Sequence, residues 1–367
     1  MEQERWEWRA GDQGDLRAGL VDFLDAQGLG GEPGAQRGDT VVALLAGAYG
    51  CAQIAGLPPG HFSPVSAVPE LAVVAYRRAL DPGRSDPGRS DSGRLGEWAL
   101  SWSDAQHAEA VEAVRDTIAQ GEVYQANVVG HRSAPHHSNP MKLAAAVAGL
   151  PGATYGGVLG GSGWAVGCAS PEQLVRVVQG RITTVPIKGT LAVAPGSREL
   201  LLASVKDRAE HIMIVDLERN DLARVAETGS VTVEQLYELS NWSGLWQASS
   251  TVGARLRSGV TTVDVLRALL PGGSVTGAPK RAACALLAGL EPVGRGPAMG
   301  ALGMIWPGGL DLALTIRTIG VDDDRVHLWA GGGITWGSDP AAEVDEAHAN
   351  AAPVLRALAA AAAPLHP

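Results

Sequence analysis

The chain has 367 residues and a formal net charge of −10, with 46% hydrophobic and 19% charged residues. These values exclude an intrinsically disordered chain and are typical of a globular protein with a large core, which the length would divide into about two domains. The negative charge argues against non-specific binding to nucleic acid or to anionic membranes. It leaves open a small acidic substrate that is bound by local cations.

The cysteines and the N-terminal residues indicate in which cellular compartment we expect the protein. Cys51, Cys168 and Cys284 are far apart and form no CxxC pair, so we expect no zinc site, no disulfide framework and a reducing compartment. The first residues, MEQERW, have neither the basic nor the apolar region of a signal peptide, and no run of about 18 apolar residues follows. We therefore expect a cytoplasmic protein without a membrane-spanning segment.

The first part of the chain alternates between helix and strand patterns. Residues 16–27 predict a helix, and residues 40–45 and 71–76 predict strands. The repeat DPGRS then begins at residue 81, again at 86 and roughly once more up to Arg94. A polar repeat without apolar residues predicts a disordered loop over 81–94. We expect residues 1–95 to form an N-terminal α/β portion and residues 96–362 to form the catalytic region.

Ordered patterns resume after this loop. Ser103 and Gln106 form a capping-box pattern at the start of a predicted helix. Residues 124–129 predict a strand that carries Gln125 and Asn127 on one face, because alternate residues share a face. Residues 141–150 predict a helix, and the glycine-rich residues 156–163 suggest a loop between strands.

A single lysine, Lys188, stands among apolar and β-branched residues in the segment TVPIKGT (184–190). A lysine in a dry site can lose its proton and act as a nucleophile or base. The other interpretation is a lysine that is exposed at the end of a strand.

Acidic residues gather on two predicted helices. Asp207, Glu210 and His211 share one face of a helix over 204–217, unless this face is simply solvated. A second helix is predicted to begin at Asp339-Pro340 and carries Glu343 and Glu346 on one face. Two carboxylate pairs without His or Cys ligands suit Mg²⁺, which prefers oxygen ligands.

Glycine-rich segments supply the remaining candidate residues. PGGSVTGAPK (271–280) lacks the spacing of a nucleotide-binding loop, but its backbone N–H groups and Thr276 suit an anion. A hairpin is predicted over 299–306 and 310–319, with Arg317 inside its second strand, where a cation needs an anionic partner. Gly331, Gly332 and Gly333 weaken the following strand, and they mark either a bulge or a close approach of a ligand. A metal, an arginine and free N–H groups together suit a small substrate with more than one carboxylate.

In their order along the chain, these segments resemble the chorismate-utilising family, which includes anthranilate synthase, aminodeoxychorismate synthase, isochorismate synthase and salicylate synthase. The matching segments are GEVYQAN (121–127), SPE (170–172), PIKGT (186–190), KDRAEHIMIVDLERNDL (206–222), PGGSVTGAPK (271–280), IRT (316–318), AGGGI (330–334) and residues 339–346. The resemblance implies an α+β fold, in which a large two-layer antiparallel β-sheet core is surrounded by helices and the site lies between the sheets.

The resemblance also implies roles for single residues. The metal residues would be Glu210 and Glu346, helped by Asp207 and Glu343, and they would hold Mg²⁺. The substrate-binding residues for chorismate would be Thr190, Thr276, Arg317, Gly331, Gly332 and Gly333. Lys188 in PIKGT resembles aminodeoxychorismate synthases, in which the lysine attacks the ring and ammonia then displaces it at the para position; anthranilate synthases resemble PIAGT there. The chain contains no glutaminase segment, so ammonia would come from a separate glutamine amidotransferase subunit.

Three positions depart from the family pattern. Gln247 replaces the histidine of an HLVS stretch, Ala298 replaces a tyrosine and Asn350 replaces a lysine. Glutamine cannot transfer protons near neutral pH, which argues against a product that requires pyruvate elimination. With Lys188 and Gln247 as the catalytic pair, we expect Mg²⁺-dependent para-amination of chorismate to 4-amino-4-deoxychorismate. The alternatives are formation of 2-amino-2-deoxyisochorismate or isochorismate, or a chorismate-binding paralogue with reduced activity.

Overall fold

The computed structural model describes residues 2–34, 36, 38–77, 93–242 and 244–362. The helices are α1 (Leu16–Ala26), α2 (Ala48–Ala55), α3 (Asp104–Ala119), α4 (Pro140–Ala148), α5 (Ser197–Ala203), α6 (Val205–Ala223), α7 (Thr262–Leu269), α8 (Lys280–Leu290) and α9 (Pro340–Ala362), with a 3₁₀ turn at Gly273–Val275. The strands are β1 (Glu2–Trp8), β2 (Thr40–Ala46), β3 (Leu71–Arg77), β4 (Ala99–Leu100), β5 (Gln125–Pro135), β6 (Gly157–Gly161), β7 (Trp164–Cys168), β8 (Gln173–Val178), β9 (Arg181–Val185), β10 (Ile187–Ala192), β11 (Thr232–Trp242), β12 (Leu245–Arg255), β13 (Gly277–Ala278), β14 (Ala301–Trp306), β15 (Gly309–Leu314), β16 (Thr318–Asp322) and β17 (Arg325–Ile334).

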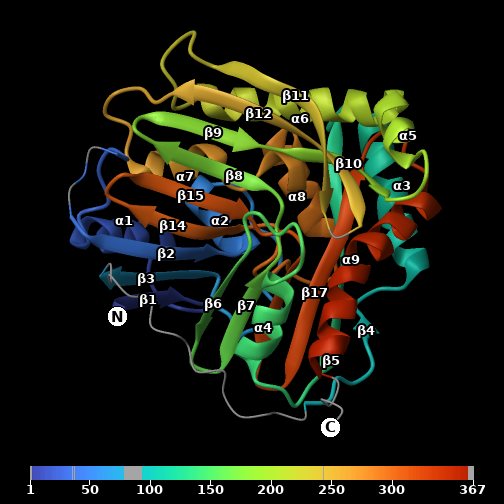
Figure 1. Cartoon of the computed structure of the whole chain (residues 1–367), viewed down its shortest axis with the longest axis horizontal. Coiled ribbons are helices and arrows are strands. Elements are labelled where there is room, and N and C mark those ends of the chain that lie inside the picture. Colours follow the sequence, from blue (N-terminus) through green and yellow to red (C-terminus); the bar gives the residue numbers. More distant parts are fainter. Residues whose placement is uncertain (1, 35, 37, 78–92, 243, 363–367) are drawn as a thin grey trace.

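The strands form two antiparallel sheets (Figure 1). The ten-stranded sheet has the order β1-β3-β2-β14-β15-β8-β9-β12-β10, with β11 added to β12. The seven-stranded sheet has the order β13-β5-β17-β16-β7-β6, with β4 added to β5. Helices surround both sheets, so the predicted α+β class with a two-sheet antiparallel core is confirmed.

The N-terminal strands belong to the same sheet as the strands of the expected catalytic region. β2 pairs with β14 from Val42 opposite Ile305 to Ala46 opposite Ala301. The N-terminal portion is therefore one edge of the ten-stranded sheet. The predicted loop over 81–94 falls almost wholly on residues 78–92, which lie outside the described residues.

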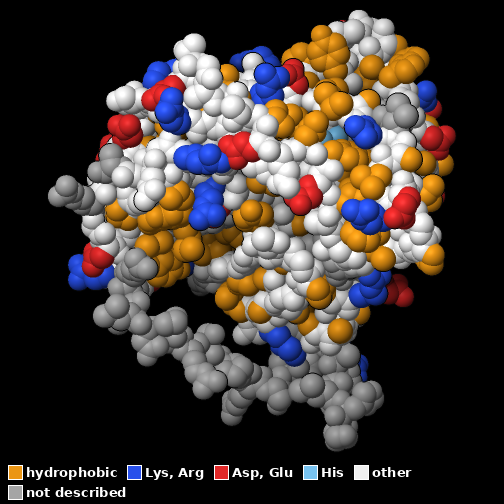
Figure 2. Space-filling view, turned by 45° about the horizontal axis from the view of Figure 1, so that its top comes forward, with side chains coloured by type: hydrophobic (Ala, Val, Ile, Leu, Met, Phe, Trp, Pro, Cys, Tyr) orange, Lys and Arg blue, Asp and Glu red, His pale blue; other side chains and the backbone are white. Residues whose placement is uncertain are grey.

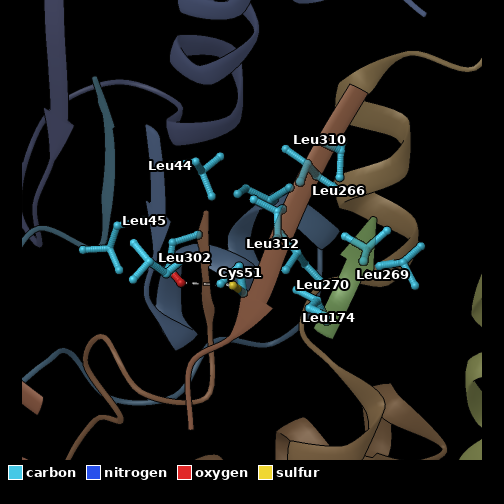
Figure 3. Packing of buried hydrophobic residues seen from close by; sticks show 14 of the residues in the cluster. Leu44, Leu45, Cys51, Leu174, Leu266, Leu269, Leu270, Leu302, Leu310 and Leu312 are labelled. Atoms are coloured by element: carbon cyan, nitrogen blue, oxygen red, sulfur yellow. Dashed lines mark hydrogen bonds between the residues drawn. The ribbon is translucent and has the colours of Figure 1, made fainter. Parts of the chain in front are cut away.

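The core of the ten-stranded sheet is built from alternating leucines that face helices. On β15, Leu310 and Leu312 are fully buried and belong to the same apolar cluster as Leu266 and Leu269 of α7 (Figure 3). Cys51 of α2 lies in the same layer, and its thiol donates to the Ala46 carbonyl at 3.4 Å. A second apolar cluster joins α4 and α9 to β16 and β17. No helix in the described ranges is long and apolar enough to cross a membrane.

The outer surface carries both charged and hydrophobic side chains. Figure 2 shows side chains of both charges next to one another, with hydrophobic areas between them. Exposed ion pairs of the ten-stranded sheet join Arg176 to Asp311 across β8 and β15, and Arg181 to Glu234. Such exposed pairs contribute little to stability, so the leucine layer carries most of it.

Two predictions about local structure are wrong. The glycine-rich residues 156–163 contain strand β6, which pairs with β7 along its whole length. Its glycines allow close packing, because a Cβ at Gly160 would lie 2.5 Å from the sulfur of Met141 on α4. The second correction concerns Arg317, which does not lie inside a strand.

The chain passes from one sheet to the other at Arg317. The predicted hairpin exists as β14 and β15, but β15 ends at Leu314, and β16 belongs to the seven-stranded sheet. Arg317 takes a left-handed conformation with φ of 52°, which is uncommon for a residue other than glycine. The β-branched residues around it suggested a strand, but the switch between sheets breaks that strand.

We expect Leu312→Ala to lower the free energy of unfolding by about 2–5 kcal/mol, because it leaves a cavity beneath α7. Met304→Ala on the neighbouring strand β14 is the control, since the Met304 side chain is 54% exposed. Urea denaturation of both variants measures the difference. Equal losses would contradict the assignment of the leucine layer as the core.

Candidate active site

A pocket with about 670 Å³ of empty space, its open mouth included, lies where the two sheets meet. The ten-stranded sheet contributes residues of β10 and β12, and the seven-stranded sheet contributes β5 and β17. Helix α9 and the 3₁₀ turn complete the wall. The lining residues that carry polar side chains are Asn127, Glu172, Lys188, Gln247, Ser274, Arg317, Glu346 and Asn350.

A bulge in β10 sets the direction of Lys188. The register of β10 against β12 shifts between Lys188 and Thr190, and the intervening Gly189 has φ of 79°. A glycine in the left-handed region is typical of a bulge that turns a side chain out of the regular alternation. The lysine nitrogen Nζ reaches across to Gly333 of β17, where an added Cβ would lie 2.6 Å from it. Lys188 therefore lines the pocket, which is the position that a lysine acting as a nucleophile would need.

Gln247 and Arg317 form a pair inside the pocket. With the amide oxygen of Gln247 directed toward the guanidinium, it accepts hydrogen bonds from NH1 of Arg317 at 3.0 Å and from NH2. Arg317 is buried, which lowers its pKa, while the nearby carboxylate Glu172 raises it. A neutral amide oxygen thus compensates part of the cost of burying this cation.

Glu172 is a pocket residue to which the sequence reasoning assigned no role. It is buried, and its Oε1 accepts a hydrogen bond from the Ser274 hydroxyl at 2.6 Å. Burial raises the pKa of Glu172 to about 7, although the Ser274 hydrogen bond and the charges of Lys188 and Arg317 lower it. A carboxyl group with such a pKa can give or take a proton near neutral pH. The SPE segment (170–172) was the signal that could have identified it.

The acidic residues of α9 meet the triple-glycine strand. A Cβ at Gly332 would lie 3.2 Å from Oε2 of Glu343 and 3.5 Å from Oε1 of Glu346, so two carboxylates approach one point of the backbone. Glu210 of α6 accepts a hydrogen bond from the Thr335 hydroxyl at 2.9 Å. Among the residues that the structure describes, no three His, Cys, Asp or Glu side chains form a group that could hold a metal. The pair Glu343 and Glu346 is brought together, and Glu210 is linked to the same strand end through Thr335.

Other predicted residues have different positions. Thr276 donates its hydroxyl to the Gly272 carbonyl at 2.8 Å and lines a neighbouring cavity, whereas Ser274 and Val275 line the pocket. The side chains of Thr190 and Asp207 lie outside the described part of the chain. His211 is buried beneath β10 and β12, with Nε2 at 2.5 Å from the Ser250 hydroxyl, and does not join the carboxylates of α9.

Asn350 and Ala298 are two of the three positions that depart from the family pattern, and the structure shows what surrounds each of them. Asn350 lines the pocket and donates from Nδ2 to the Gly331 carbonyl at 3.2 Å. Ala298 is fully buried beside Met299, which lines both the pocket and the neighbouring cavity. Asn350 therefore stabilises the glycine strand instead of presenting a positive charge to the pocket.

Comparison with known proteins agrees with this arrangement. A family model for chorismate binding enzymes matches residues 71–356. The chain belongs to the chorismate binding enzyme family. Its relatives include anthranilate synthase component 1 of Streptomyces coelicolor, 40% identical over 68% of this chain and 50% of the relative. Aminodeoxychorismate synthase component 1 of Klebsiella aerogenes is 35% identical over 68% of this chain and 57% of the relative, so the chain spans about half the length of these curated relatives.

Solved structures of this family share the fold. Anthranilate synthase component I from Streptococcus pneumoniae superposes with a TM-score of 0.79 at 25% identity, covering 95% of this chain and 89% of that chain. An isochorismate synthase from Bacillus anthracis superposes with a TM-score of 0.70 at 19% identity, over 97% of this chain and 92% of that one. The second similarity supports the fold alone.

The raised pKa of Glu172 predicts how stability depends on pH. The folded protein holds this proton up to about pH 7, whereas the unfolded chain loses it near 4.5. The stabilisation is complete below pH 4.5 and is lost as the pH rises through 7. We expect Glu172→Gln to gain stability relative to the wild type, by about 2 kcal/mol between pH 5 and pH 8.

Urea denaturation of both proteins at pH 5, 6, 7 and 8 measures this difference. The carboxyl group of Glu70 also has a raised pKa because it is buried, but it is common to both proteins and cancels in the comparison. Burial raises the pKa of Glu218 as well, and the charge of Glu172 raises it further, so the measured difference includes the loss of this repulsion in Glu172→Gln. A constant difference across this pH range would show that Glu172 ionises normally in the folded state.

Proposed function

We propose that this chain catalyses the para-amination of chorismate to 4-amino-4-deoxychorismate, with ammonia from a separate glutamine amidotransferase subunit. The observation that carries the proposal is the position of Lys188, an amine on the pocket wall close to the buried carboxyl group of Glu172. Relatives of the family include both anthranilate synthases and aminodeoxychorismate synthases, so their names alone do not choose the product. Lysine in the PIKGT segment favours the para product.

The proposed reaction exchanges a hydroxyl group for an amino group. Nζ of Lys188 forms a bond to the ring while the ring hydroxyl leaves as water, taking a proton from Glu172. The proton that Lys188 loses on forming this bond returns to the carboxylate. Ammonia then forms a carbon–nitrogen bond at the para position as the bond to Lys188 breaks. One proton of the ammonia passes by way of Glu172 to the departing lysine nitrogen, which restores the free amine and leaves an amino group on the ring.

Arg317 and the glycine strand would bind the substrate. The guanidinium offers charge-assisted hydrogen bonds to a carboxylate, and Gln247 orients it from the other side. The backbone of Gly331, Gly332 and Gly333 lines the pocket without side chains, so a ring can approach closely. Because Gln247 cannot transfer a proton near neutral pH, pyruvate would stay on the ring.

Glu343 and Glu346 suit Mg²⁺, since they offer hard oxygen ligands at one point of β17, while Glu210 of α6 is held near the same strand end by Thr335 without forming a group of three with them. One or two carboxylates together with water and substrate oxygens are a typical Mg²⁺ environment. When bound, the ion would neutralise substrate carboxylate charge. The three acids lie on two helices: α9 packs on β17, and Glu210 of α6 reaches Thr335 directly after that strand.

Product analysis tests the function. We expect the purified chain, with chorismate, Mg²⁺ and ammonium salt, to form an aminated product that a lyase converts to 4-aminobenzoate. Lys188→Met should lower this rate by on the order of 10³-fold, because it removes the nucleophile and keeps the length of the side chain. Lys142→Met on α4 is the matched control, since Lys142 does not line the pocket.

Each outcome of this experiment has a clear meaning. Para-amination that persists in Lys188→Met would contradict the covalent step. A 2-amino product would identify ortho-amination, and unchanged chorismate in a folded wild-type protein would reject both aminating activities.

Metal removal gives an independent prediction. We expect chelation to abolish amination and added Mg²⁺ to restore it. Glu346→Gln should raise the Mg²⁺ concentration for half-maximal activity at least about tenfold, because one carboxylate ligand is lost. Glu227→Gln, which removes a surface carboxylate beside Arg255, should leave that concentration unchanged. Activity that survives thorough chelation would refute the metal requirement.

A further inference from the structure

Gln125, the first residue of β5, is a buried amide without hydrogen bonds. It is 1% exposed, and neither its Oε1 nor its Nε2 has a partner among the described residues. Buried polar groups in folded proteins are nearly always paired, because an unpaired one costs free energy. An unpaired amide beside a pocket therefore indicates that its hydrogen bond forms only when the protein carries out its function.

The amide of Gln125 lies next to the Lys188 amine. A Cβ at Gly333 would lie 2.6 Å from Nζ of Lys188 and 3.0 Å from Nε2 of Gln125, so both side chains enter the space above this glycine. β5 and β17 pair directly here, with Asn127 opposite Gly333. The absence of a side chain at residue 333 is what lets the lysine and the amide approach one another.

The amine of Lys188 also lacks a hydrogen-bond partner in the part of the chain that the structure describes. Its Nζ forms no hydrogen bond or ion pair with the described residues. Four of the other polar pocket residues are paired with each other, Arg317 with Gln247 and Glu172 with Ser274. An amine has N–H donors and the Gln125 amide has an oxygen acceptor, so the two groups that lack partners match.

We propose that Gln125 is a positioning residue for Lys188. Its amide oxygen accepts an N–H hydrogen bond from the amine in the substrate-filled pocket and thereby directs the nitrogen lone pair toward the ring. The inference rests on the proposed function, since it concerns the nucleophile of that reaction. A misplacement of a reacting atom by about 1 Å can lower a rate about 100-fold, so such a contact has a measurable effect.

Gln125→Leu separates positioning from packing. Removing an unpaired amide should keep or raise the melting temperature, while kcat for amination falls about 10- to 100-fold and KM changes little. The matched control is Gln173→Leu, because Gln173 is equally buried but hydrogen bonded to Thr183 and Asp311. It should lose stability and retain kcat. A residue that merely fills space would show wild-type kcat in Gln125→Leu, and this result overturns the proposal.

Chemical labelling tests the contact without amination. Acetic anhydride modifies uncharged amines, and peptide mapping reports the rate at Lys188. Gln125→Glu places a carboxylate beside the amine and favours its charged form, so labelling of Lys188 should slow at least about fivefold while Lys142 is unaffected. Unchanged labelling of Lys188 overturns the proposal, because a carboxylate at residue 125 would then be too far from the amine to favour its charged form.

The two measurements distinguish this inference from the proposed function. A wild-type chain that forms no aminated product rejects the function, and the labelling comparison alone then decides the contact. A wild-type chain that aminates, with slowed labelling in Gln125→Glu and unchanged kcat in Gln125→Leu, shows proximity without positioning and overturns the inference while the function stands.

Discussion

The site depends on the burial of a cation where the chain leaves one sheet and enters the other. Arg317 lies between β15 and β16, and its backbone takes a left-handed conformation there. Its carbonyl accepts a hydrogen bond from the amide of Ala169, which ties the crossover to the segment that carries Glu172. The guanidinium thus lies between the two sheets, facing the Gln247 amide and under the influence of the Glu172 charge. Both side chains belong to the ten-stranded side, since Gln247 is on β12 and Glu172 directly precedes β8, whereas Ala169 directly follows β7 of the seven-stranded sheet. The backbone of Arg317 is thus held from one sheet and its buried charge is compensated from the other.

The parts that the sequence predicts well are those governed by neighbouring residues. The capping box of Ser103 and Gln106 forms as expected, and α9 begins at Pro340 after Asp339. The β14–β15 hairpin turns at the predicted residues because Pro307 and the two glycines after it favour a turn. In PIKGT, the glycine that follows Lys188 forms a bulge, and Lys188 lines the pocket; the reactivity of its amine stays a prediction.

The parts that it does not predict depend on contacts between distant segments. Glycines in β6 suggested a loop, because the tight packing of α4 that requires them is not visible in the local sequence. Arg317 was assigned to a strand because its neighbours are β-branched, but the residue types of neighbours do not indicate that the chain passes from one sheet to the other there. Thr276 bonds to its own turn, while Ser274 two residues earlier faces Glu172. In each case the side-chain direction is set by tertiary packing and not by residue type.

The same residue types serve structure or chemistry according to whether their hydrogen-bonding groups are satisfied. The side chain of Lys280 is only 10% exposed and bonds to Asp221 at 2.6 Å, which joins α8 to α6 and leaves no reactive amine. Lys188 and the unpaired amide of Gln125 lie above the same residue of β17, Gly333, and Nζ of Lys188 forms no hydrogen bond or ion pair with the described residues. A protein retains such unpaired groups at the cost of stability, and this cost is offset only when a ligand completes the pairing. The amine and the amide above Gly333 are therefore the place where the proposed function would supply the missing hydrogen bonds.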